Sequence, residues 1–213
     1  LYPMNALVED QFERIQKSIL QINKQLPSEK KITYTIYNGD TPSLNNIKNK
    51  HYVQNYSVDI NKSSDDKEMF ELVYNSEQDR YIYTSESGLK LNEFIVSREE
   101  IRDRKPDIII SNYSMIDTSL LRKEDENLFN SRTIQHIILD EAHTYVGTRG
   151  IHVSYLLRRL RELIENNNLK FIITSATLKK TSDEIQDKKD IANFVSELIG
   201  SKFDIENVVF ATF

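Results

Sequence analysis

Three short, isoleucine-rich runs constrain the fold of this chain more than any other feature of its sequence. They occupy residues 107–110, 136–139 and 171–174, and each contains at least two consecutive isoleucines. Short runs of β-branched side chains are typical of strands that are buried on both faces of a parallel sheet. Stretches with helical periodicity lie between them. This alternation of strands and helices predicts a doubly wound α/β fold.

The helices are predicted from apolar side chains that recur at steps of three and four. One covers residues 151–166, with Leu157 and Leu163 among its inward positions. Another covers residues 188–199 and is expected to end at Gly200, since glycine is common just after a helix.

The first 42 residues add one helix and one strand. An apolar stripe that includes Phe12 and Ile22 predicts a helix, which Asn5 is placed to cap and Pro27 to close. A β-rich run at residues 32–37 follows and ends in a turn. We therefore expect one sheet of parallel strands, sandwiched by helices. Its strands lie near residues 32–37, 107–111, 137–140 and 171–174.

Residues 43–97 fit this pattern poorly. Segments 51–60 and 69–83 alternate loosely between apolar and polar residues, and residues 61–67 are polar. We expect an inserted antiparallel hairpin or small lobe that projects from the edge of the sheet. The predicted organisation is the start of a domain in residues 1–42, an insertion in residues 43–97, and the remainder of the domain in residues 98–213.

Composition excludes several kinds of site. The chain has 213 residues and no cysteine, which excludes disulfides, thiolate catalysis and cysteine-based metal sites. Its net charge of −5 provides no overall positive field, so any contact with nucleic acid must be local. There is no run of about 18 apolar residues that would span a membrane. We expect a cytoplasmic protein without a membrane partner.

The strongest chemical signal is Asp140-Glu141-Ala142-His143, directly after the run at residues 136–139. Ligands of open α/β sheets bind at the carboxyl ends of the strands. Two adjacent carboxylates at that edge suit a nucleotide–metal site, in which the first holds Mg²⁺ and the second orients or deprotonates a water molecule. An acidic turn with a structural histidine is the alternative interpretation.

A second signal, Ser175-Ala176-Thr177, follows the next run along the chain. Parallel neighbours bring their carboxyl ends together, so these hydroxyl groups are expected to reach His143. A strand-to-loop turn would explain this tripeptide alone, but its position beside the first motif favours a shared site. A metal-dependent hydrolase that uses Asp140, Glu141 and His143 is a weaker hypothesis, because three ligands so close on a strand end cannot readily converge on one metal.

These motifs resemble those of superfamily 2 DEAD/DEAH-box helicases. Residues 140–143 are similar to motif II, the Walker B element, and residues 175–177 to motif III. Residues 2–7 resemble motif Ia, and Gly39-Asp40-Thr41 resembles the element that follows it. The segment 106–115 is similar to a further family motif. The stretch after motif II resembles a branch that includes mitomycin-repair, RecQ4-like repair and some phage-defence helicases.

The resemblance implies a first RecA-like domain of the P-loop NTPase type that uses ATP and Mg²⁺. It implies that Asp140 coordinates Mg²⁺ and that Glu141 activates the hydrolytic water. It further implies that His143, Ser175, Ala176 and Thr177 couple the nucleotide state to a second RecA-like domain of the same polypeptide. The implied nucleic-acid track, with DNA favoured, comprises Pro3, Asn5, Gly39, Asp40, Thr41, Ser111 and Asn112.

One departure from the family pattern is the absence of GxxxxGK[ST], the phosphate loop, from these 213 residues. The chain is therefore expected to be an N-terminally truncated motor domain that begins at motif Ia and is inactive alone. The main alternative is a non-catalytic nucleic-acid-binding or scaffold module that kept the helicase fold. The presence of both carboxylates favours the enzyme.

Overall fold

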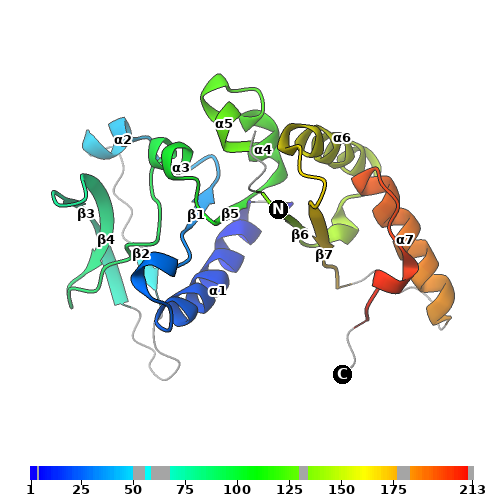
Figure 1. Cartoon of the computed structure of the whole chain (residues 1–213), viewed down its shortest axis with the longest axis horizontal. Coiled ribbons are helices and arrows are strands. Elements are labelled where there is room, and N and C mark those ends of the chain that lie inside the picture. Colours follow the sequence, from blue (N-terminus) through cyan, green and yellow to red (C-terminus); the bar gives the residue numbers. More distant parts are fainter. Residues whose placement is uncertain (4, 50–55, 59–67, 130–133, 177–182, 211–213) are drawn as a thin grey trace. The chain divides into compact units, whose positions relative to one another are not determined.

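The computed structural model describes the chain in two compact units (Figure 1). Its described residues are 1–3, 5–49, 56–58, 68–129, 134–176 and 183–210. One unit comprises Leu1–Pro3 with Ile116–Phe213, and the other comprises Met4–Met115. Each unit combines parallel strands with helices, and each is considered by itself below.

In the Met4–Met115 unit, a two-stranded parallel sheet packs against a long helix. Strand β1 (Tyr34–Tyr37) pairs with β5 (Ile108–Ser111), with Tyr34 opposite Ile108. Helix α1 (Asn5–Asn23) contacts both strands. Aromatic rings fill the core, since Phe94 stacks on Tyr34 at 5.4 Å and lies 5.3 Å from Phe12. The buried hydroxyl of Tyr34 is satisfied by Gln16, whose Nε2 donates to it at 3.0 Å.

The same unit contains a three-stranded antiparallel sheet, called the lobe here. It comprises β2 (Tyr56–Val58), β3 (Glu68–Asn75) and β4 (Arg80–Ser85), in that order. The antiparallel hairpin predicted in this region is thus confirmed. The polar segment 61–67 lies outside the described residues, and the interpretation of residues 43–97 as an insertion stays a prediction.

Short helices complete this unit. They are the 3₁₀ helix η1 (Ser28–Lys30), α2 (Leu44–Lys48), α3 (Arg98–Arg104), and the first residues of α4 (Tyr113–Ser119).

The other unit is built on the parallel pair β6 (His136–Leu139) and β7 (Lys170–Ile173). Two long helices, α6 (Gly147–Ile164) and α7 (Glu184–Ile199), pack against each other. Arg161 of α6 donates to the carbonyl groups of Ile199 and Gly200, where α7 ends. The remaining short elements are η2 (Lys123–Asp125), α5 (Glu126–Phe129), η3 (Ala142–Thr144) and η4 (Ile205–Asn207).

All four strands predicted in the α/β pattern are present and paired in parallel, but the single sheet that we expected is wrong for the described residues. They form two separate two-stranded sheets, one in each unit. Within the unit that holds β6, the main chain of Leu1 bonds to that strand. The Leu1 nitrogen donates to the carbonyl of Ile138, and the Leu1 carbonyl accepts from the Asp140 nitrogen at 3.1 Å.

Two helix positions also differ from the prediction. Ile22 is 47% exposed and Leu163 is 38% exposed, although both were expected to face inward. At the end of α1 the buried position belongs to Asn23, whose side chain bonds both the N–H and the C=O of Ile32, at 2.8 and 2.9 Å. The hydrogen bonds of Asn23 therefore put a polar residue, and not Ile22, at the buried position of this turn. The predicted end of α7 is confirmed, since Gly200 adopts a left-handed φ of 68°.

No helix within the described ranges combines the length and the apolar character needed to cross a membrane.

Candidate functional site

The chain makes a tight turn as it leaves β6. Glu141 adopts a left-handed conformation (φ 52°, ψ 45°), and η3 begins at the next residue. The amide and hydroxyl of Thr144 both donate to the Glu141 carbonyl, at 2.9 and 2.8 Å. The amide of Ala142, which is fully buried, donates to the Thr174 carbonyl at 3.0 Å. The turn is thereby tied to β7, and this support compensates for an uncommon backbone conformation.

Asp140 stands at the carboxyl end of β6 and is oriented by two donors. Its Oδ1 accepts from the amide of Glu141 at 3.0 Å and from the hydroxyl of Thr174. The contact between Thr174 and Asp140 was not predicted from the sequence. The parallel register indicates this contact, because Leu139 lies opposite Ile173 and the next pair is therefore Asp140 and Thr174.

His143 lies between the two sequence motifs. Its Nδ1 is 3.0 Å from the Ser175 hydroxyl oxygen and 3.3 Å from Oε2 of Glu141. The predicted approach of Ser175 to His143 is therefore confirmed. A single ring nitrogen either donates a hydrogen bond to Glu141 or accepts one from the Ser175 hydroxyl, but it cannot do both at once. Ala176 is exposed beside this contact, and Thr177 lies outside the described residues.

The start of the chain reaches the same turn. Tyr2 and Pro3 are buried, and burial, followed by the negative charge of Asp140, raises the pKa of Tyr2 above its usual value. The buried Tyr145 directs its hydroxyl to the Leu1 carbonyl at 3.4 Å. Of the predicted motif Ia residues, Pro3 thus lies in the unit that holds Asp140. Asn5 begins α1, and its side chain lies outside the described residues.

A second candidate site is the loop after β1, residues 38–43, called the 38–43 loop here. Asn38 Oδ1 accepts from the amides of Asp40 and Thr41, at 3.0 and 3.1 Å. The Thr41 hydroxyl donates to the Ile36 carbonyl at 2.9 Å. These bonds hold Gly39, Asp40 and Thr41 in one preorganised loop. The loop borders a pocket of about 390 Å³, lined by Gly39, Asp40, Thr41, Pro42, Ser43, Asn46 and Arg98.

The predicted pair Ser111 and Asn112 lies at the end of β5, in the same unit as this loop. Both residues are buried. The Ser111 hydroxyl donates to the carbonyl of Tyr37, the last residue of β1. Asn112 Oδ1 accepts from the Met115 amide at 2.7 Å, a contact that caps the first turn of α4. These side chains therefore shape the loops at one edge of the β1–β5 sheet.

The described residues contain no group of three or more His, Asp or Glu side chains placed to hold a metal ion. This arrangement still fits Mg²⁺ in a nucleotide site, because protein commonly supplies one or two carboxylates there and the phosphates and water supply the rest. Asp140 is the carboxylate whose hydrogen bonds orient it to serve as such a ligand.

Comparison with known proteins identifies the family. Residues 67–185, more than half of the chain, match the family model "DEAD/DEAH box helicase". The chain belongs to the DEAD/DEAH box helicase family. This assignment confirms the predicted family, and with the parallel α/β architecture it supports the predicted RecA-like fold.

Two relatives and one solved structure align with nearly the whole chain of this helicase-family protein. The Druantia protein DruE of Escherichia coli (strain UMEA 4076-1) is 28% identical over 96% of the chain. The ATP-dependent helicase hrq1 of Schizosaccharomyces pombe is 24% identical over 95% of the chain. The chain spans 14% of the length of each relative. The crystal structure of the DUF1998 helicase MrfA bound to DNA has a similar fold, with a TM-score of 0.54 and 22% identity, over 96% of this chain and 18% of MrfA.

Proposed function

We propose that this chain is part of the first motor domain of an ATP-dependent DNA helicase or translocase of superfamily 2. The observation that carries the proposal is the contact between His143 and Ser175, 3.0 Å apart at the carboxyl ends of adjacent parallel strands. This contact supports the proposal because it joins the segment of Asp140 and Glu141 to Ser175 at the edge of the sheet where ligands bind in open α/β folds. The choice of DNA is supported by the DNA bound to MrfA.

In this proposal Asp140 and Glu141 have different roles. Asp140, oriented by Thr174 and by the Glu141 amide, coordinates Mg²⁺. When bound, Mg²⁺ neutralises negative charge on the nucleotide phosphates. Glu141 accepts the proton of the attacking water, and its carboxylate lies 3.3 Å from His143 Nδ1.

The groups beyond the carboxylates transmit the nucleotide state. His143 contacts both Glu141 and Ser175, so a change at the γ-phosphate would reach the segment that continues through Ala176 and Thr177. We assign these residues to coupling with a second RecA-like domain of the same polypeptide.

The nucleic-acid track comprises Pro3, Asn5, Gly39, Asp40, Thr41, Ser111 and Asn112. Gly39 and Asp40 are exposed and line the pocket, so they are the candidates for direct contact with the strand. Thr41, Ser111 and Asn112 are buried and would act by shaping their loops.

The test is steady-state ATPase activity of the complete polypeptide, with and without single-stranded DNA. Glu141→Gln is expected to lower the maximal rate by about 10²–10⁴-fold, the usual contribution of general acid–base catalysis, while nucleotide affinity is retained. Asp140→Asn should instead raise the Mg²⁺ concentration required for nucleotide binding. Glu162→Gln, the same change at an exposed position of α6, is the matched control.

A Glu141→Gln variant that hydrolyses ATP at the wild-type rate would contradict the assignment of roles. A wild-type polypeptide that binds DNA but hydrolyses no ATP would favour the non-catalytic nucleic-acid-binding or scaffold module.

A further inference from the structure

Arg98, the first residue of α3, holds the 38–43 loop although it lies 57 residues beyond Thr41 in the chain. Its Nε donates to the Thr41 carbonyl at 2.7 Å, and its Nη2 donates to the Gly39 carbonyl at 2.9 Å. Its backbone amide donates to the Pro42 carbonyl at 2.9 Å. One residue thus binds the carbonyls of Gly39, Thr41 and Pro42 and joins the loop to α3.

These contacts decide what the loop presents to the pocket. Carbonyl oxygens repel a nucleic-acid phosphate, since both carry negative charge. With the carbonyls of Gly39 and Thr41 bound to Arg98, their partial charges are neutralised by a guanidinium at the pocket wall. The loop can then accept an anionic strand even though the exposed Asp40 lies on it.

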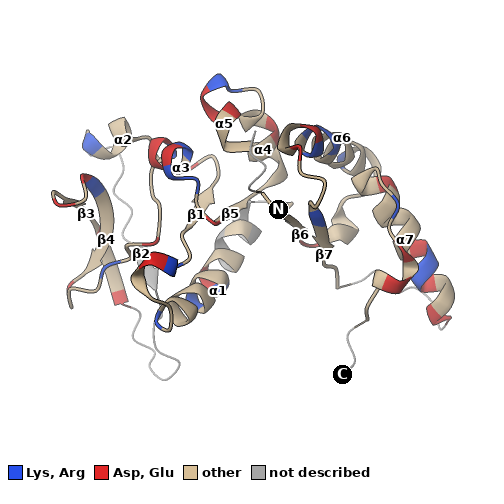
Figure 2. Cartoon of the chain, in the orientation of Figure 1, with Lys and Arg blue, Asp and Glu red and all other residues tan. Residues whose placement is uncertain are grey.

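Helix α3 is itself held in place by other contacts, so the backbone of Arg98 has a fixed position. Glu99 Oε2 accepts from the Leu44 amide at 2.8 Å, which joins α3 to α2 beside the pocket. Glu100 lies 2.9 Å from Nε of Arg80, the first residue of β4 in the lobe. In Figure 2 acidic and basic residues are interspersed along α3, and both signs are used in these contacts.

We propose that Arg98 is a positioning residue for nucleic-acid binding by the 38–43 loop. It acts through the loop carbonyls and not by contacting the strand. This inference rests on the proposed function and adds a residue that the family motifs above do not include. The role requires the planar fork of a guanidinium, which bonds two carbonyls at once, so lysine cannot replace it despite its equal charge.

The experiment titrates the ATPase activity of the complete polypeptide with oligo-dT. The variants are Arg98→Ala and Arg98→Lys. Arg104→Ala is the matched control, because Arg104 lies on the same helix and pairs with Glu100 instead of the loop. Both Arg98 variants should raise the half-activating DNA concentration about tenfold, as expected for lost charge-assisted hydrogen bonds. The maximal rate should change less than this concentration, and Arg104→Ala should match the wild type.

A second readout separates positioning from direct contact. Oligo-dT affinity is measured by fluorescence anisotropy as a function of salt. The slope of log affinity against log salt should stay at the wild-type value, whereas loss of a phosphate ligand would reduce it by about 1. Rescue by Arg98→Lys, a reduced slope, or unchanged activation by both variants would overturn the proposal.

Thermal unfolding of each variant is recorded alongside, and if Arg98→Ala does not fold, Arg98→Lys decides the outcome. A wild-type polypeptide that DNA does not activate would count against the proposed function. If DNA activates both the wild type and Arg98→Lys normally, the role of Arg98 is contradicted and the proposed function is not.

Discussion

Gly150 is closely packed and Gly39 is not, although each lies beside a candidate functional segment. A Cβ added at Gly150 would lie 2.5 Å from the carbonyl oxygen of Tyr145, well inside van der Waals contact. Tyr145 is buried directly after η3 and cannot move away freely. Gly39 has no heavy atom within 4 Å of the same position, and it lines the pocket of the 38–43 loop. Packing thus requires glycine at position 150, whereas the space around position 39 is open.

Substituting each glycine separates these two requirements. Gly150→Ala should destabilise the chain by about 1–3 kcal/mol, the usual cost of overpacking. Gly39→Ala should change stability by less than about 0.5 kcal/mol, as for a surface substitution. Under the proposed function it should nevertheless weaken oligo-dT binding. Thermal unfolding followed by circular dichroism, together with anisotropy titrations, measures both effects. Equal loss of stability in the two variants would contradict the packing argument.

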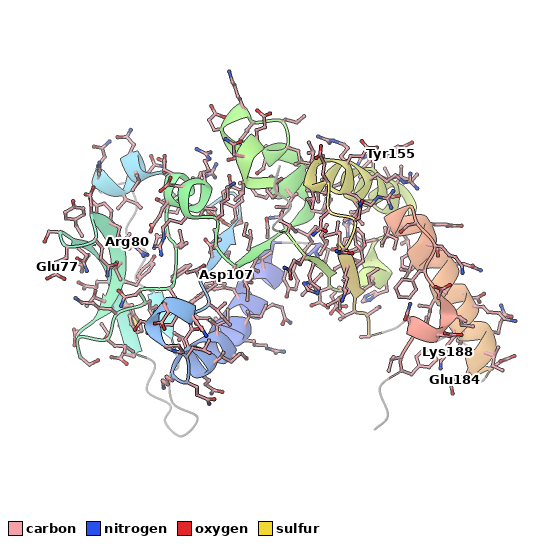
Figure 3. All side chains as sticks on the ribbon, in the orientation of Figure 1. Glu77, Arg80, Asp107, Tyr155, Glu184 and Lys188 are labelled. Carbon is pink, nitrogen blue, oxygen red and sulfur yellow. The ribbon has the colours of Figure 1, made fainter. Side chains whose placement is uncertain are left out.

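At the scale of elements, the lobe is tied to α3 by a largely buried ion pair. The side chains of Arg80 and Glu100 are only 10% and 13% exposed, and their 2.9 Å approach is an ion pair without the alignment of a hydrogen bond. Arg80, labelled in Figure 3, also donates to the carbonyls of Asn92 and Phe94 at 3.0 Å each. Burial lowers the pKa of Arg80 from its usual value, and the charge of Glu100 opposes this effect.

Breaking this pair should be costly. Arg80→Met leaves the Glu100 carboxylate paired, among the described residues, with the partly exposed Arg104 alone, so the expected loss is about 3 kcal/mol, at the low end for buried pairs. Urea unfolding measures it. Glu184→Gln is the control, because it removes an exposed i,i+4 contact with Lys188 on α7 (Figure 3) and should leave the transition unchanged. A similar midpoint for both variants would show that the lobe is not held by Arg80.

At the scale of the whole molecule, the 213 residues supply the carboxylates of the proposed nucleotide site but no GxxxxGK[ST] sequence. A phosphate loop normally binds the β- and γ-phosphates through backbone amides and a lysine. Without one, a triphosphate near Asp140 and Glu141 meets two like charges, with Mg²⁺ as the cation between them.

We therefore expect the 213-residue chain alone to bind ATP weakly and to show no significant hydrolysis. Calorimetric titration with Mg²⁺–ATP and a phosphate-release assay, each with and without single-stranded DNA, measure these properties. Addition of DNA should not rescue the activity. Robust hydrolysis by this chain would mean that other cationic groups replace the phosphate loop.

The sequence by itself determined the parallel strands and one contact between the motifs at their ends. Short β-branched or β-rich runs located all four parallel strands to within two residues, and Gly200 marked the end of α7. The approach of His143 to Ser175 was also predictable, because parallel neighbours bring their carboxyl ends together. These features depend on local propensity and on strand direction, which short stretches of sequence encode.

Only the tertiary structure decided which distant groups meet. The division of the strands into two parallel pairs is one example, and no local pattern encodes it. Arg98 reaches the 38–43 loop across 57 residues of chain, so its role could not be read from a motif. Hydrogen bonds to backbone carbonyls are available to any suitably placed arginine, and the fold alone determines which one makes them.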